Sequence, residues 1–110
     1  MTDVTILKNF IHLRYIDLSN NNLKDISSLN GLTHLLTLKV DFNKLTNIKL
    51  DILPYLQQAS FSDNKIKTIE VTSLPKLETL NVNSESNDHL SIIKLSLNNS
   101  LRIIYFQITN

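Results

Sequence analysis

The residues of this chain that could bind a metal or move a proton are few, and two histidines come first. His12 and His34 are followed, at almost the same interval each time, by Tyr55 and Lys76. Imidazole is a common zinc ligand, but a closed zinc site needs about four ligands. The spacing therefore favours two neighbouring surface side chains over a metal site.

The other potential nucleophiles, acids and bases do not form a catalytic pattern. His89 follows Asp88 and lies close to Glu85 in a polar stretch that is typical of a solvated loop. Three serines on expected strands have no histidine–carboxylate pair placed to activate them: Ser19, Ser60 and Ser62. Gly31 is the only glycine, which excludes a glycine-rich phosphate loop. We predict no catalysis, no cofactor and no metal.

Composition narrows the class of partner. The 110 residues suit one domain, and 42% hydrophobic with 19% charged residues is ordinary for a folded chain. A net charge of +1 gives no field that would attract nucleic acid or an anionic membrane. No apolar run approaches the roughly 18 residues of a membrane span, and the N-terminus lacks the apolar block of a signal peptide. The absence of cysteine excludes disulfides and favours an intracellular chain.

A recurring apolar pattern is the strongest signal in the sequence. LRYIDLSNNNL at Leu13 returns in nearly equal steps as LLTLKVDFNKL at Leu35, LQQASFSDNKI at Leu56 and LETLNVNSESN at Leu77. The shared template L-x-x-L-x-L-x-x-N-x-L is that of leucine-rich repeats. The sequence therefore predicts an α/β fold, a leucine-rich repeat solenoid of four to five repeats. We expect a short right-handed arc with a parallel sheet on the concave side and a 3₁₀ or irregular convex side.

The elements of one repeat follow from its spacing. Apolar residues alternate with polar ones from Leu13 to Leu18, which predicts a short strand with one face inward. An asparagine then ends the strand, where a buried amide can bond backbone groups that the strand ladder no longer reaches. These structural asparagines are Asn21, Asn43 and Asn64. Apolar residues every third position from Leu23 to Leu32 suit 3₁₀ turns on the outer side.

The domain has a regular part and a degenerate part. We assign residues 1–110 to one leucine-rich repeat domain, with regular repeats over 1–82 and a degenerate C-terminal repeat over 83–110. The stretch from Thr2 aligns with that from Lys24, so the chain enters in the second half of a repeat. We expect a loop over 83–89 and a fifth strand through Leu101, Ile104 and Phe106. The stretch 91–97 fits either an outer helix or an extended return.

The residues between the strand leucines form the candidate binding surface. By alternation, a concave protein-binding face holds Tyr15, Asp17, Thr37, Lys39, Asp41, Gln58, Ser60 and Asn81, with Phe42 at its rim. This surface is polar and mixed in charge, and it lacks the basic stripe that a phosphate backbone requires. We therefore expect protein partners, with no nucleic acid, membrane or small-molecule substrate. Both terminal strands would be open edges, which predicts a fragment or a chain completed by neighbours in an assembly.

The repeats also resemble known families. Their rhythm resembles the phosphatase-regulating SDS-type repeat proteins. The runs LTHLLTLKVD from Leu32 and LPYLQQASF from Leu53 include residues that the repeat fold does not require. Over roughly residues 2–82 they are similar to the opening repeats of the leucine-rich repeat-containing protein 23 family. That resemblance implies a non-enzymatic scaffold that bridges other proteins of a radial spoke in the ciliary axoneme. The alternative is a soluble regulatory subunit of the type that binds protein phosphatase 1.

Overall fold

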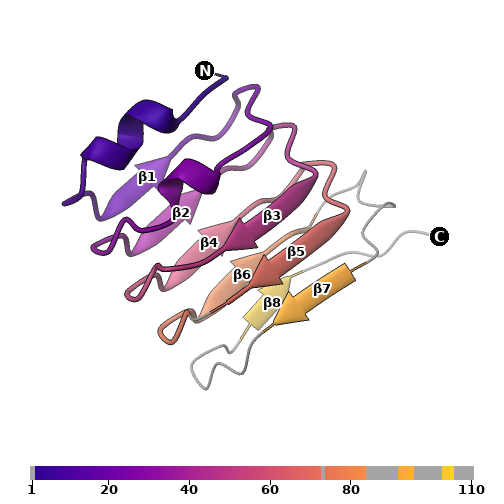
Figure 1. Cartoon of the computed structure of the whole chain (residues 1–110). Coiled ribbons are helices and arrows are strands. Elements are labelled where there is room, and N and C mark those ends of the chain that lie inside the picture. The colour runs from indigo at the N-terminus through magenta and orange to yellow at the C-terminus, as the bar shows by residue number, and fades with distance from the viewer. Residues whose placement is uncertain (1, 73, 84–91, 96–102, 106–110) are drawn as a thin grey trace.

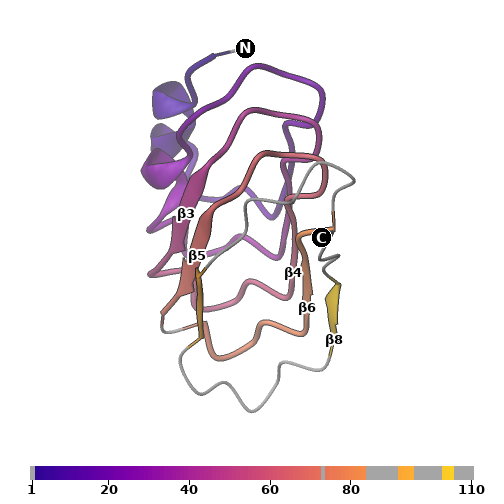
Figure 2. The ribbon, with the colours of Figure 1, turned by 90° about the vertical axis from the view of Figure 1, so that its right-hand side faces the viewer.

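The chain folds as a flattened coil with two facing walls (Figures 1 and 2). The structure is a computed structural model, and it describes residues 2–72, 74–83, 92–95 and 103–105. The loop expected over 83–89 lies outside these ranges from residue 84 onward, as do Glu85, His89, Leu101 and Phe106. No helix in the described part of the chain is long and apolar enough to cross a membrane.

One wall is a parallel sheet with one short strand from each repeat. Its strands are β1 (Tyr15–Asp17), β2 (Thr37–Lys39), β4 (Gln58–Ser60), β6 (Thr79–Asn81) and β8 (Ile103–Tyr105), in the order β1-β2-β4-β6-β8. The register is uniform, because Tyr15 pairs with Thr37, Thr37 with Gln58, and Gln58 with Thr79. Equivalent positions of successive repeats therefore form straight columns. The predicted leucine-rich repeat solenoid is confirmed.

The opposite wall changes its character along the chain. It begins with two 3₁₀ helices, η1 (Thr5–Asn9) and η2 (Ser27–Leu29). It then continues as a parallel sheet of three strands: β3 (Asn47–Leu50), β5 (Thr68–Val71) and β7 (Ile92–Leu95). The first part agrees with the expected 3₁₀ turns, but the sheet was not predicted. In β3 and β5, alternate residues are buried and include Ile48, Ile69 and Val71, a pattern that favours strand over 3₁₀ helix. Residues 92–95 adopt the extended one of the two predicted conformations.

The core lies between the two walls and is almost entirely aliphatic. Leu23, Leu45 and Ile66 hold equivalent positions in successive repeats, and each is fully buried. Ala59 replaces the leucine expected in the third strand, and the fully buried ring of Phe61 is the largest side chain of the core. Continuous contact between neighbouring repeats is what stabilises such a coil, since one repeat alone cannot bury its apolar side.

Two of the three asparagines link each repeat to the one before it. Asn43 accepts a hydrogen bond from the Leu23 backbone N–H (3.0 Å) and donates to the carbonyls of Leu18 (3.0 Å) and Val40 (3.2 Å). Asn64 repeats this arrangement with the Leu45 N–H and with the carbonyls of Val40 and Phe61, all at 3.0 Å. Asn43 and Asn64 are buried, whereas Asn21 is half-buried and donates to Leu18 (2.8 Å) and Ser19 (3.3 Å).

Two turns in the repeat require left-handed backbone. We call β1, β2, β4, β6 and β8 the inner strands. The first turn lies just after an inner strand, where Asn20, Phe42 and Asp63 have φ values of 61°, 54° and 55°. The second lies on the way back to that strand, where Gly31 has φ 95° and Ile52, at the equivalent place of the next repeat, has φ 56°. Glycine adopts this region freely, whereas for a bulky or β-branched residue it is strained.

Candidate protein-interaction face

On the sheet of β1, β2, β4 and β6, polar side chains form a regular surface that faces away from the core. We call this surface the ladder face; within the described residues it consists of Tyr15, Asp17, Thr37, Lys39, Gln58, Ser60, Thr79 and Asn81. A shallow hollow of about 120 Å³ crosses its middle, lined by residues of β2, β4 and β6. Each side chain there belongs to a column at the strand spacing of about 4.8 Å, so the face is a periodic grid of polar groups.

The first two strands of the ladder face carry its charge. The pKa of the Asp17 carboxyl is lowered from 3.8, first by hydrogen bonds from Ser19, while the charge of Lys39 contributes least. The Lys39 ammonium lies 5.8 Å from the centre of the Tyr15 ring, within the range of a cation–π contact. Tyr15 is 55% exposed, so a large part of its side chain is available to a partner.

Asp41 lies just after the end of β2 and is already occupied by protein groups. Its Oδ1 accepts hydrogen bonds from the Ser60 hydroxyl (2.6 Å) and from the Ser62 backbone N–H and hydroxyl (both 2.8 Å). The Asp41 N–H donates to the Ser19 hydroxyl of the previous repeat (3.2 Å). Asp41 was predicted as part of the binding face. In the structure it is half-buried and joins its own repeat to the one on either side.

Phe42 is the large apolar group at the rim of the ladder face. It is 55% exposed and adopts the left-handed conformation described above. Its burial adds little to the core, and its backbone conformation is unfavourable for an aromatic residue. An exposed, strained aromatic is a candidate contact residue, because nothing in the fold itself calls for it.

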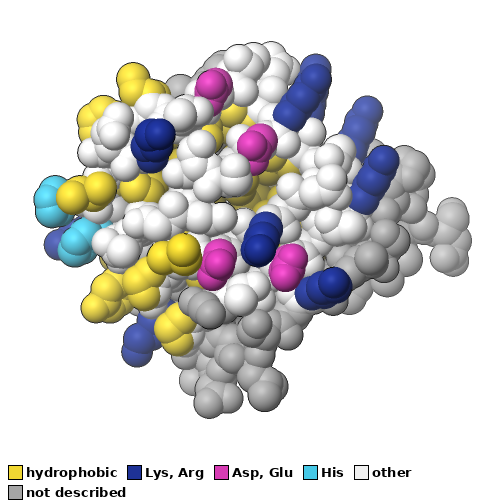
Figure 3. Space-filling view, in the orientation of Figure 1, with side chains coloured by type: hydrophobic (Ala, Val, Ile, Leu, Met, Phe, Trp, Pro, Cys, Tyr) yellow, Lys and Arg dark blue, Asp and Glu magenta, His cyan; other side chains and the backbone are white. Residues whose placement is uncertain are grey.

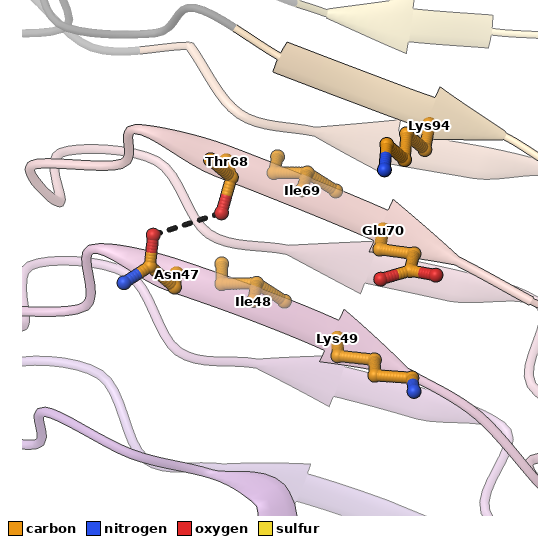
Figure 4. Close-up of a pocket in the computed structure, with 7 residues that line it drawn as sticks. All are labelled: Asn47, Ile48, Lys49, Thr68, Ile69, Glu70 and Lys94. Atoms are coloured by element: carbon orange, nitrogen blue, oxygen red, sulfur yellow. Dashed lines mark hydrogen bonds between the residues drawn. The ribbon is translucent and has the colours of Figure 1, made fainter.

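The sheet of β3, β5 and β7, which we call the outer sheet, carries a second polar surface. This surface was not predicted from the sequence. A hollow of about 270 Å³ lies over β3, β5 and β7. Figure 4 shows the residues that line it: Asn47, Ile48, Lys49, Thr68, Ile69, Glu70 and Lys94. The Thr68 hydroxyl donates to the Asn47 side-chain oxygen (2.8 Å). Lys49, Glu70 and Lys94 share one register position, so positive and negative groups alternate across this sheet. Figure 3 shows the same face with basic and acidic side chains interspersed.

The described residues contain no group of three or more histidine, cysteine, aspartate or glutamate side chains that could hold a metal ion. His12 and His34 are neighbours, as their spacing predicted, with ring centres 5.3 Å apart. Ser19, Ser60 and Ser62 take part in the Asp17 and Asp41 hydrogen bonds described above. The structure therefore offers binding surfaces rather than a recognisable catalytic constellation in the part that it describes.

Comparison with known proteins agrees with this architecture. Residues 11–55 match the family model described as Leucine Rich repeats (2 copies). The chain is a leucine-rich repeat protein. This match covers two of the inner strands, β1 and β2, and the outer strand β3.

The repeats are also similar to named proteins from mammals. The chain is 52% identical over 86 residues to human (Homo sapiens) leucine-rich repeat-containing protein 23, which covers 78% of this chain and 25% of that protein. It is 50% identical over 82 residues to the protein of the same name from Bos taurus, which covers 74% of this chain and 24% of the relative. The chain thus spans about a quarter of the length of these relatives. No solved structure gives a significant match.

Proposed function

We propose that this protein is a non-enzymatic adaptor of the ciliary axoneme, where its ladder face binds neighbouring proteins of a radial spoke. The observation that carries the adaptor role is the ladder face itself, a grid of exposed and half-buried polar groups with the aromatic Tyr15 on it and the aromatic Phe42 at its rim. Tyrosine and phenylalanine are enriched in protein interfaces, and mixed polar neighbours supply specificity. The assignment to a radial spoke rests on the likeness to leucine-rich repeat-containing protein 23.

A second candidate is a soluble regulatory subunit of the type that binds protein phosphatase 1. The repeat rhythm supports it. Such a subunit would present a contiguous acidic and aromatic patch, whereas here Asp17 lies beside Lys39 and Asp41 is engaged by Ser60 and Ser62. We therefore place the spoke adaptor first.

A tagged copy of the chain in ciliated cells separates the two candidates. We expect the tagged chain to remain with the axoneme after extraction with detergent and then with salt. A copy found only in the soluble cytosol would contradict the spoke adaptor and favour the phosphatase subunit. Crosslinking mass spectrometry on the same cilia identifies the neighbours.

Matched variants test whether the ladder face makes the contact. Lys39→Glu reverses a charge in the middle of that face, and Phe42→Asn removes the exposed ring while suiting the left-handed backbone. Lys49→Glu is the control, because it reverses a charge of the same type on the outer sheet. We expect the first two to reduce axonemal retention several-fold and Lys49→Glu to leave it unchanged. Equal loss for Lys39→Glu and Lys49→Glu would refute a role specific to the ladder face.

A further inference from the structure

One turn recurs before the inner strands and sets a column of side chains at the edge of the coil. The backbone N–H of Leu13 bonds the Phe10 carbonyl (3.1 Å), and that of Leu35 bonds the Leu32 carbonyl in the same way (3.1 Å). The third and fourth repeats close the same turn at Leu56 and Leu77 (both 3.2 Å). Because the turns share one geometry, their third residues stack above one another. These residues are His12, His34, Tyr55 and Lys76.

The first two members of this column are imidazoles held close together at the surface. Their ring centres are 5.3 Å apart and their planes are inclined by 39°. Both side chains are exposed, and Figure 3 shows the histidine side chains of the described residues side by side at one edge of the molecule. Their approach is set by the backbone, since a hydrogen bond closes each turn and the second turn is also anchored by the buried Leu32 and Leu35.

The separation of the rings matches that of two histidines on one metal ion. With Zn–N bonds of about 2.0–2.1 Å and roughly tetrahedral angles, two imidazoles on one zinc have ring centres about 5 Å apart. Because both side chains are exposed, each ring has room to turn one nitrogen toward a shared ion.

The sequence predicted no metal here, but from the distance between the rings we propose that His12 and His34 form an open, two-ligand site for a divalent transition-metal ion of the zinc type. The site is not a closed structural one, because no third histidine, cysteine or carboxylate joins the pair among the described residues. Tyr55, the next member of the column, is a poor zinc ligand when it is protonated. Two imidazoles supply half of a tetrahedral shell, and water completes it.

Zinc titration of the whole chain, produced without a polyhistidine tag, tests the site. Isothermal calorimetry with zinc chloride in a non-chelating buffer should give one saturable ion per chain. Zinc should also move the ring resonances of both His12 and His34 in proton–carbon NMR spectra. Absence of saturable binding at millimolar zinc would overturn the proposal.

A matched pair of variants separates the column from general histidine affinity. We expect His34→Ala to lower the zinc affinity by roughly tenfold or more, because a single imidazole remains. His89→Ala removes the third histidine of the chain and should leave the affinity within a factor of about two. Circular dichroism verifies that each variant is folded. An equal loss in the two variants would refute the assignment of zinc to the His12–His34 pair.

Discussion

At the scale of single residues, the side-chain amides bond backbone groups that the strand ladders do not reach. Where the inner strand ends, the chain turns away and leaves backbone groups inside the coil. Asn43 and Asn64 each reach one N–H and several carbonyls there, on their own repeat and on the previous one. The repeat template places an asparagine at these positions, and burial of its amide explains why that residue type is needed.

Replacement of Asn43 by alanine should destabilise the fold by about 2–4 kcal/mol, because the buried Leu23 N–H and nearby carbonyls lose their partner. Asn21→Ala should cost less than half as much, since Asn21 is half-buried and water can replace part of its contacts. Urea unfolding followed by circular dichroism measures both free energies. A cost for Asn43→Ala below that for Asn21→Ala would contradict this account.

The Asp17 carboxyl gives a prediction about pH. Its pKa in the folded chain is lowered from 3.8 chiefly by Ser19, so the ionised form is favoured by folding. This contribution to stability is present above about pH 4 and is lost as the pH falls through the lowered pKa. We expect Ser19→Ala to raise the pKa of Asp17 toward 3.8, and Lys39→Ala to raise it less. Carbon NMR titration of the carboxyl checks the order, and a larger effect of Lys39→Ala would reverse the assigned causes.

At the scale of the elements, the return turn shows that one backbone shape is kept with different residues. Gly31 and Ile52 hold the same place in successive repeats, and the Gly31 N–H donates to the Ile52 carbonyl (3.0 Å). Nothing lies within 4 Å of a Cβ placed on Gly31, so only its φ of 95° demands glycine. Ile52 holds a similar conformation with 59% of its side chain exposed.

Ile52→Gly should therefore stabilise the protein by about 0.5–1 kcal/mol, since relief of the left-handed strain exceeds the entropy lost by glycine. Gly31→Ala should destabilise it by about 1 kcal/mol through backbone strain alone. Chemical denaturation of the two variants checks both signs. Destabilisation by Ile52→Gly would mean that the exposed side chain of Ile52 contributes to packing.

At the scale of the whole molecule, neighbouring repeats are coupled because their asparagines donate to the same backbone carbonyls. The Leu18 carbonyl accepts from both Asn21 and Asn43, and the Val40 carbonyl accepts from both Asn43 and Asn64. Each of these asparagines therefore shares a hydrogen-bond acceptor with the asparagine of the next repeat. In an array where each repeat contacts only its neighbours, coupling of this kind makes unfolding cooperative along the axis.

Double-mutant cycles measure this coupling. Alanine at Asn43 and Asn64 together should depart from additivity by at least about 0.5 kcal/mol, because both side chains bond the same carbonyl. Asn21 and Asn64 lie two repeats apart, and their effects should add within about 0.5 kcal/mol. Additive effects for Asn43 and Asn64 would argue against the shared carbonyls as the source of cooperativity.

The inner strands were predictable from the sequence, because the two-residue alternation at Leu13–Leu18 and its returns admits one interpretation. The pairing of His12 with His34 followed from their common repeat position. The outer sheet was harder to predict from the sequence. An apolar residue at every third position, as at Leu45 and Ile48, suits a 3₁₀ turn as well as the start of a strand. The hydrogen bonds of Asp41 could not be predicted from the sequence. Its partners Ser60 and Ser62 belong to the next repeat, and nothing in the sequence distinguishes serines that bond a neighbouring repeat from serines that face solvent.

The strands β3, β5 and β7 have a mechanical consequence for how the coil meets another molecule. Repeats backed by α-helices bend into a horseshoe, because helices need about 8–10 Å of spacing while strands need about 4.8 Å. Here strands line both sides from the second full repeat onward, so the two sides advance by equal steps. We therefore expect this part of the chain to curve less than the arc that the sequence predicted. A partner would therefore meet a nearly flat surface rather than a concave one, and its own contact surface should be correspondingly flat.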